Sequence, residues 1–378
     1  MKKILGFLKK ELMLSVSVVA AIVSLFITPP SADLIKNVDW HTLGTLFMML
    51  CVLEGFKREN IFRPLLLWCT RFKTMCSLSL FLIFGVFFTS MFVTNDVSLI
   101  IFVPLTMILF KGAGREKYIL PVITLENIAA IRGSLLMPFG SPQNLFFYGR
   151  FGISAWDFII MMAPLAGISA LLLFVFVLML YRKELKESYS ADIKHITDDW
   201  ENRFRIRRIS YIALFLMVLA VIVTRTDYWM WAAGIVVAVI FIVNRELFKH
   251  VDYVLIITFF CFFIFSESIA ASPAISSFLS KAVAGHEYVW ILALSQIISN
   301  VPSSIVLYPF SANNTALIYG ADTAGLISLI GSLASVINYR IYVREYPGKG
   351  KAFIKTFTLI SWAFFAIVVI PGYLLSRM

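Results

Sequence analysis

The chain has 378 residues, of which 60% are hydrophobic and only 15% are charged, and its mean hydropathy is +0.87. This composition excludes an ordinary soluble domain, because a soluble chain could not cover so much apolar surface. The net charge of +11 does not indicate a nucleic-acid-binding protein, because the basic residues collect in short connectors between apolar runs. The sequence therefore predicts an all-α polytopic membrane protein.

The first half of the chain, residues 1–181, is predicted to form one membrane repeat. Lysines before its first apolar run place the N-terminus in the cytoplasm, and we expect an uncleaved first span. Basic residues between positions 57 and 73 mark a cytoplasmic connector, in which residues 61–68 are expected to form an amphipathic interfacial helix. The predicted elements of this half are spans at 12–27 and 40–56, a hairpin at 76–110, a broken span at 118–148 and a span at 155–181.

Residues 182–208 interleave acidic and basic side chains and are interpreted as a cytoplasmic linker. The second half, residues 209–378, is predicted to be an inverted copy of the first, and its topology leaves the C-terminus outside the cytoplasmic (inner) membrane. Its predicted elements are spans at 209–224, 228–243 and 251–269, a hairpin at 289–312, a broken span at 317–343 and a span at 353–375.

A short polar segment, which we call the tip, interrupts the apolar sequence once in each half. The tip at residues 94–98 aligns with the tip at residues 299–303, so that Asn95 matches Asn300, 205 positions later. Each tip is followed by a break, a run of helix-breaking residues inside a long apolar segment. The two breaks lie at residues 138–144 and 330–335. This repeated order predicts inverted repeats with two re-entrant hairpins and two broken transmembrane helices, which is typical of secondary transporters.

The charges around the first tip fit two topologies, a re-entrant hairpin or two full spans with the tip in an outer loop. The second arm of this segment, residues 98–110, is short, and the turn before it is expected to contain four or five residues, Asp96 among them. These lengths favour the hairpin, with its tip near the bilayer midplane.

Tips and breaks together bring helix ends to one place in the membrane. Free N–H groups at helix N-termini suit an anion, and free carbonyl and side-chain oxygens suit a small cation. The candidate substrate-binding residues are Thr94, Asn95, Asp96, Arg132, Ser141, Asn144, Ser299, Asn300, Ser303 and Ser332. The candidate cation-binding residues are Asn95, Asp96, Gly140, Asn300 and Gly331. We expect no cofactor beyond sodium or a proton as coupling ion, no other metal and no catalytic residue.

Two charged candidates have alternative interpretations. Asp96 is the only carboxylate in either tip, and it is expected to bind sodium, to carry a proton or simply to cap the next helix. Arg132 precedes the first break, where it either holds a substrate anion or pairs with Asp322 or Glu126.

Four segments carry a family resemblance: Thr94-Asn95-Asp96, Gly140-Ser141-Pro142-Gln143-Asn144, Ser299-Asn300-Val301-Pro302 and Gly331-Ser332. They resemble the ion-transporter superfamily, which includes citrate-transporter-like permeases, divalent-anion/sodium symporters, arsenical-pump membrane proteins and a sodium/proton antiporter family. The resemblance implies that tips and breaks form the substrate and sodium sites. It also implies that one domain moves against a scaffold, often in a homodimer. The carboxylate symporters have tips that resemble Ser-Asn-Thr, whereas the Asn-Asp tip and the Pro-Gln-Asn break here are closer to the arsenical-pump branch.

The expected function is secondary active transport of a small anionic solute, such as a di- or tricarboxylate, coupled to sodium or protons. The alternatives are an arsenite/antimonite efflux permease, which would call for a separate ATPase subunit if it pumped, and a sodium/proton antiporter. A membrane-embedded enzyme is disfavoured, because the four histidines lie near span ends or in connectors without a catalytic pattern. We expect lipid and a small solute as partners, and no nucleic acid.

Overall fold

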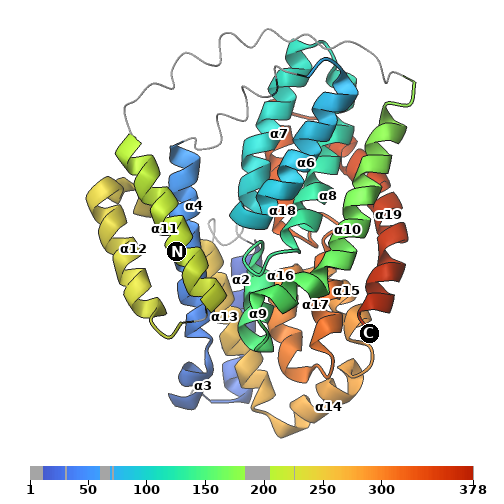
Figure 1. Ribbon diagram of the computed structural model, residues 1–378. Coiled ribbons are helices and arrows are strands. Elements are labelled where there is room, and N and C mark those ends of the chain that lie inside the picture. Colours follow the sequence, from blue (N-terminus) through green and yellow to red (C-terminus); the bar gives the residue numbers. More distant parts are fainter. Residues whose placement is uncertain are drawn as a thin grey trace.

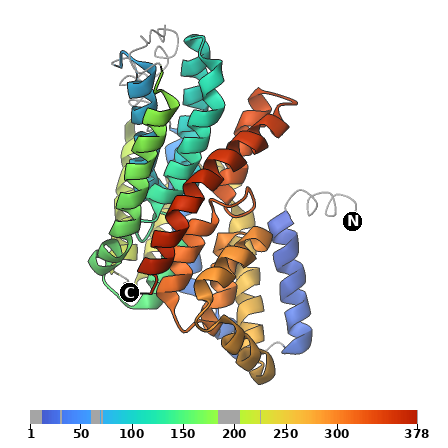
Figure 2. The same ribbon diagram turned by 90° about the vertical axis from the view of Figure 1, so that its right-hand side faces the viewer.

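The computed structural model describes residues 12–29, 32–59, 69, 72–183, 205–224 and 226–377. Within these ranges the chain forms helices and turns without any strand (Figure 1, Figure 2). Seven of the described helices are long and apolar enough to cross a membrane. The predicted all-α polytopic membrane fold is therefore confirmed.

The described part of the first half contains nine helical segments. They are α2 (Leu12–Ile27), α3 (Ala32–Asn37), α4 (Trp40–Arg58), α6 (Met75–Val93), α7 (Asn95–Gly112), η1 (Glu116–Tyr118), α8 (Ile119–Ser134), α9 (Pro142–Phe151) and α10 (Ala155–Leu180). The interfacial helix expected at residues 61–68 and most of the linker expected at 182–208 lie outside the described residues.

Among the described residues, the second half contains more short helices than the first. Its helices are α11 (Arg205–Thr224), α12 (Trp229–Asn244), η3 (Arg245–Lys249), α13 (Tyr253–Ala270), α14 (Pro273–Val283), α15 (Glu287–Ile298), α16 (Asn300–Leu307), η4 (Tyr308–Phe310), α17 (Asn314–Ala324), α18 (Leu333–Glu345) and α19 (Gly350–Leu375).

The expected lengths around the first tip are wrong. Helix α7 begins at Asn95 and has 18 residues, and α6 before it has 19, so each arm is long enough to cross a membrane. The turn between the arms is the single residue Thr94, and Asp96 lies in the first turn of α7. The arms at the second tip, α15 and α16, have only 12 and 8 residues. Arm length therefore no longer favours a re-entrant hairpin at the first tip, although it fits one at the second.

Both predicted broken spans are divided into two helices. In the first half α8 ends at Ser134 and α9 begins at Pro142, where the fixed φ of proline suits the first helical position. In the second half α17 ends at Ala324 and α18 begins at Leu333. The backbone between these ends is extended or turned, so its polar groups depend on side chains and neighbouring helices for partners.

Most of the described α-helices pack in two groups. The scaffold group contains α2, α3, α4, α11, α12 and α13, in which α4 packs against α11 and α12, and α13 packs against α2. The hairpin group contains α6 to α10 and α15 to α19. Figure 1 shows α4, α11 and α12 on one side of the molecule and α10 and α19 on the other. The main contacts between the groups are α13 with α16 and α4 with α9, and each group contains helices from both halves of the chain.

Candidate functional site

The two tips share one unusual backbone conformation. Thr94 has φ 71° and ψ 158°, and Ser299 has φ 71° and ψ 159°. They are the only described residues other than glycine with positive φ. This region of φ and ψ is almost confined to glycine, because a Cβ atom clashes with the neighbouring backbone. Each tip therefore holds its two arms at a sharp, strained turn of one residue.

Both tips line a cavity of about 360 Å³ between the scaffold group and the hairpin group. The scaffold side is formed by Leu14 of α2 and by residues at the start of α13. The hairpin side is formed by Asp96 of the first tip, by Ser299 and Val301 of the second tip, and by residues of the second break and α18. The two tips, which align with each other in the sequence, therefore line the same cavity.

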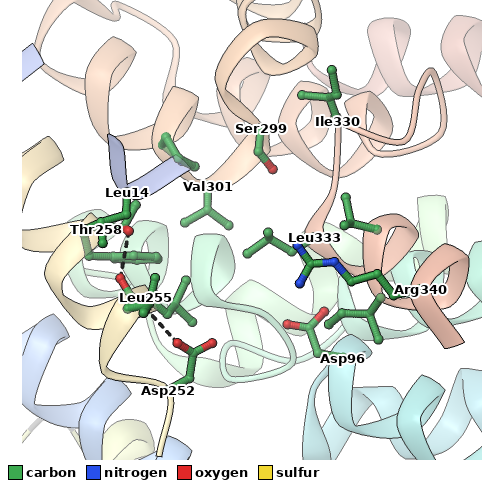
Figure 3. Close-up of a pocket in the computed structure, with 15 residues that line it drawn as sticks. Leu14, Asp96, Asp252, Leu255, Thr258, Ser299, Val301, Ile330, Leu333 and Arg340 are labelled. Atoms are coloured by element: carbon green, nitrogen blue, oxygen red, sulfur yellow. Dashed lines mark hydrogen bonds between the residues drawn. The ribbon is translucent and has the colours of Figure 1, made fainter. Parts of the chain in front are cut away.

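Three charged side chains line this cavity: Asp96, Asp252 and Arg340. Figure 3 shows the carboxylate of Asp96 and the guanidinium of Arg340 pointing toward each other, with Asp252 on the opposite wall. Asp252 caps α13, because its Oδ1 accepts a hydrogen bond of 3.0 Å from the N–H of Leu255. The cavity thus combines two carboxylates with one guanidinium.

Asp96 does not act as the cap of α7, since that position belongs to Thr94 and Asp96 lies within the first turn. The Oδ1 atom of Asp96 is buried and has no hydrogen-bond partner among the described residues. The main-chain N–H of Asp96 donates to Oδ1 of buried Asn95 at 2.9 Å. A carboxylate with an unpartnered oxygen in such a place is well suited to accept a proton or a cation.

Asn300 ties the second tip to the second break. Its main-chain N–H donates to the carbonyl of Gly331 at 3.2 Å, and its Nδ2 donates to the carbonyl of Ala321 at 3.3 Å. Ser303 turns back to the main chain, because its Oγ donates to the Ser299 carbonyl at 2.8 Å. Asn300 therefore holds the tip in place, and Ser303 bonds within its own helical turn.

Asn144 performs the corresponding task at the first break. Its Nδ2 donates to the carbonyls of Leu135 and Ser134, at 3.0 and 3.1 Å, which the end of α8 leaves free. Ser141 caps α9 by accepting a hydrogen bond of 3.3 Å from the Asn144 N–H. Ser332 occupies the matching position before α18, where its side chain makes no capping bond. The first break is thus held chiefly by Asn144 and Ser141.

A glycine lets the chain pass close to the preceding helix at each break. A Cβ atom on Gly140 would lie 2.1 Å from the carbonyl oxygen of Ser134. A Cβ atom on Gly331 would lie 2.5 Å from the carbonyl oxygen of Ala324. Both distances are too short for any side chain, so glycine is required sterically whether or not its carbonyl binds a cation.

Arg132 lies away from the cavity, in a fully buried cluster. Its Nε donates to Ser169 Oγ at 2.9 Å, and its Nη1 donates to the main-chain carbonyl of Asp322 at 3.0 Å. The Asp322 carboxylate accepts instead from Gln143 Nε2 at 3.0 Å. Glu126, the other partner considered for Arg132, accepts from Thr106 Oγ1. The cluster joins the ends of α8 and α17, which precede the two breaks.

Comparison with known proteins bears directly on these features. A family model described as citrate transporter matches residues 4–331. The chain belongs to the citrate transporter family. Inner membrane protein YbiR of Escherichia coli K12 is 32% identical over 308 residues, which cover 80% of each chain. An uncharacterized transporter of Methanocaldococcus jannaschii is 30% identical over 318 residues, covering 80% of this chain and 81% of the relative. The resemblance inferred from tips and breaks is thus confirmed, and the protein is a membrane transporter of this family.

This citrate transporter family member has cavity residues that the sequence did not reveal. Neither Arg340 nor Asp252 was singled out from the sequence, and each lies within a few residues of a basic connector. Their position in the last turns of α18 and at the start of α13 brings them into the cavity with Asp96. The available signal for Arg340 was an arginine inside the predicted broken span at 317–343.

Proposed function

We propose that the protein is a secondary active transporter that moves a small organic anion, such as a di- or tricarboxylate, across the inner membrane. The observation that carries the proposal is the cavity that both tips line between two groups of helices. A site between two bodies changes its exposure when one body moves against the other, which is the physical basis of alternating access. Membership of the citrate transporter family is in accord with such a substrate.

We propose further that the hairpin group moves against the scaffold group, and that the tips and breaks of the two halves have opposite orientations in the membrane. In Figure 1 the connection between α7 and α8 lies at the top, whereas α14, which leads into α15, lies at the bottom. The basic connectors that flank α13 and α18 support a cavity that opens toward the cytoplasm in this conformation. The preference of basic connectors for the cytoplasmic side also supports a cytoplasmic N-terminus and an outer C-terminus.

Asp96 is proposed as the site of the coupling ion. Its Oδ1 is buried without a hydrogen-bond partner among the described residues, and its side chain lines the cavity, where a proton or a sodium ion would neutralise the charge. If a proton is the coupling ion, Asp96→Asn abolishes the response of uptake to a pH gradient. If sodium is the coupling ion, the same variant weakens sodium activation and leaves the pH profile nearly unchanged, because an amide oxygen still coordinates without charge.

The decisive experiment is uptake into proteoliposomes of purified protein, with citrate, succinate, sulfate and arsenite as separate substrates and with sodium and pH varied independently. Accumulation of a carboxylate that depends on an ion gradient supports the proposal. Accumulation of arsenite alone, or sodium/proton exchange without any anion, favours the second candidate, an arsenical permease or antiporter. The observation that favours this second candidate is the Asn-Asp sequence of the first tip, which resembles the arsenical-pump branch.

A further inference from the structure

The charges of the cavity are unequal and are not paired with one another. Asp96 and Asp252 are acidic, and Arg340 is the one basic residue in the described lining. Asp252 is engaged in capping α13. Asp96 and Arg340 face each other in Figure 3, yet no hydrogen bond or ion pair within 4.0 Å joins them among the described residues. Arg340 is exposed and lines the same cavity as Asp96.

We propose that Arg340 binds the anionic group of the substrate and that Asp96 competes with the substrate for Arg340, so that neutralisation of Asp96 by the coupling ion releases Arg340 for the anion. This inference rests on the proposed function and adds to it a residue and a coupling step. A guanidinium binds a carboxylate through two parallel hydrogen bonds, and it binds a substrate carboxylate and an aspartate side chain in the same way. Asp96 and the substrate carboxylate therefore compete for the same guanidinium, that of Arg340.

The electrostatic environment of Asp96 makes this rivalry depend on the coupling ion. The charged groups that act electrostatically on Asp96 are Asp252 before α13 and Lys57 on α4, and Arg340 on α18 lines the same cavity. Helices α6 and α8, which also pack against α7, contribute no charged side chain to the cavity lining. An anion that enters while Asp96 and Asp252 are both charged is repelled by two carboxylates and meets an Arg340 that Asp96 attracts. A proton or cation on Asp96 removes its repulsion of the anion and at the same time stops Asp96 from competing for Arg340.

This arrangement couples the two ligands in a defined direction. If the coupling ion raises the affinity for the anion by some factor, the anion raises the affinity for the ion by the same factor, because binding linkage is reciprocal. The expected consequence is symport, in which anion and ion bind to the cavity together. A different role for Arg340, as one more basic residue near the cytoplasmic end of α18, predicts no such coupling. Arg344, four residues later on the same helix, is exposed and outside the cavity lining, so it serves as the matched control.

The test measures citrate and succinate binding to purified protein by calorimetry, with pH varied in sodium-free buffer and sodium varied at constant pH. Loss of one charge-assisted pair predicts that Arg340→Gln weakens binding roughly 10- to 100-fold, and that Arg340→Lys restores part of the loss. Asp96→Asn is expected to bind the anion tightly under all conditions, as wild type does only when the coupling ion is abundant. Arg344→Gln is expected to bind as wild type does, and size-exclusion profiles show that each variant is folded.

The outcomes separate the two proposals. Binding to wild type that is unchanged in Arg340→Gln overturns the role of Arg340 and leaves anion transport standing. Anion affinity that depends on the coupling ion as strongly in Asp96→Asn as in wild type overturns the competition. Absence of binding by any carboxylate to wild type overturns the proposed carboxylate substrate, and the inference with it. The arm in which affinity varies, pH or sodium, identifies the coupling ion.

Discussion

Thr94 and Ser299 adopt the same backbone conformation, φ 71° with ψ 158° and 159°, at aligned positions 205 residues apart. Each is the single residue between two helices, and neither side chain caps the helix that follows. A residue with a Cβ atom in this region costs about 1–3 kcal/mol and persists only where its surroundings hold it. The identity of two strained turns supports the internal repeat, because chance would not place the same rare conformation at both tips.

The strain at the tips predicts an unusual order of stability. Thr94→Gly and Ser299→Gly are expected to be more stable than Thr94→Ala and Ser299→Ala, respectively, by about 1 kcal/mol in the free energy of unfolding, since only glycine adopts this conformation freely. Thermal unfolding in detergent measures the order. At Ser210, a partly exposed position within α11, the order is expected to reverse, with alanine more stable than glycine by about 1 kcal/mol. Equal stability of the paired tip variants would contradict the strain.

The asparagines of the tips are expected to be essential for transport. Asn300→Ala leaves the Ala321 carbonyl without its donor, and Asn95→Ala removes the acceptor of the Asp96 N–H. We expect both variants to be expressed and folded and to lose uptake in proteoliposomes, because the tips line the cavity. Asn37→Ala, at the exposed end of α3, is the control and is expected to transport normally. Full uptake by either tip variant would reduce that tip to a simple turn.

The glycines of the breaks are expected to tolerate no side chain. Gly140→Ala and Gly331→Ala place a methyl group against a main-chain carbonyl, which cannot move aside as a flexible side chain would. Overpacking of this kind costs about 1–3 kcal/mol. Gly167→Ala within α10 meets nothing within 4 Å and is expected to raise stability by about 0.5–1 kcal/mol. Thermal unfolding compares the three, and a break variant as stable as Gly167→Ala would contradict the close approach.

The buried cluster around Arg132 is expected to show strong coupling. Arg132→Met leaves Ser169 and the Asp322 carbonyl without their donor and should cost about 3–5 kcal/mol. The double variant with Asp322→Asn is expected to fall short of the sum of the single effects by about 0.5–3 kcal/mol.

The control for the Arg132–Asp322 double-mutant cycle is a partly exposed ion pair, in which Arg150 Nε lies 3.2 Å from Asp39 Oδ2. Its coupling energy is expected to stay below about 1 kcal/mol. Additive effects in the Arg132 cycle, measured by the same unfolding assay, would show that the two buried charges do not interact.

The orientation of the two tips is tested by chemical labelling. Lys111→Cys lies near the end of α7, and Ser311→Cys follows the short helices of the second tip. In a protein whose four native cysteines are replaced, we expect a membrane-impermeant thiol reagent to label the two positions from opposite sides. Labelling of both from one side would exclude opposite orientations, and the result does not depend on the substrate.

Local sequence was a good guide to the elements at the breaks and a poor one at the first tip. Pro142 and Gly140 end or exclude a helix by themselves, so the division of both broken spans could be predicted. The turn at Thr94 could not, because Asn95 and Asp96 are poor helix formers in isolation. Because α6 and α7 pack against α8, Asn95 and Asp96 become part of helix α7, and the backbone strain is confined to Thr94.

The sequence by itself determined that the chain is a polytopic helical membrane protein, where its helices break and which family it belongs to. These properties follow from hydropathy, from proline and glycine, and from short motifs, all of which act over a few turns of chain. Only the tertiary structure decided that Asp96 faces Arg340 across one cavity and that Arg132 lies buried beside Asp322. The reason is physical: the residues of each pair are separated by more than 180 positions, and only tertiary contacts, namely the packing of α18 on α7 and the hydrogen bond between α8 and α17, bring them together.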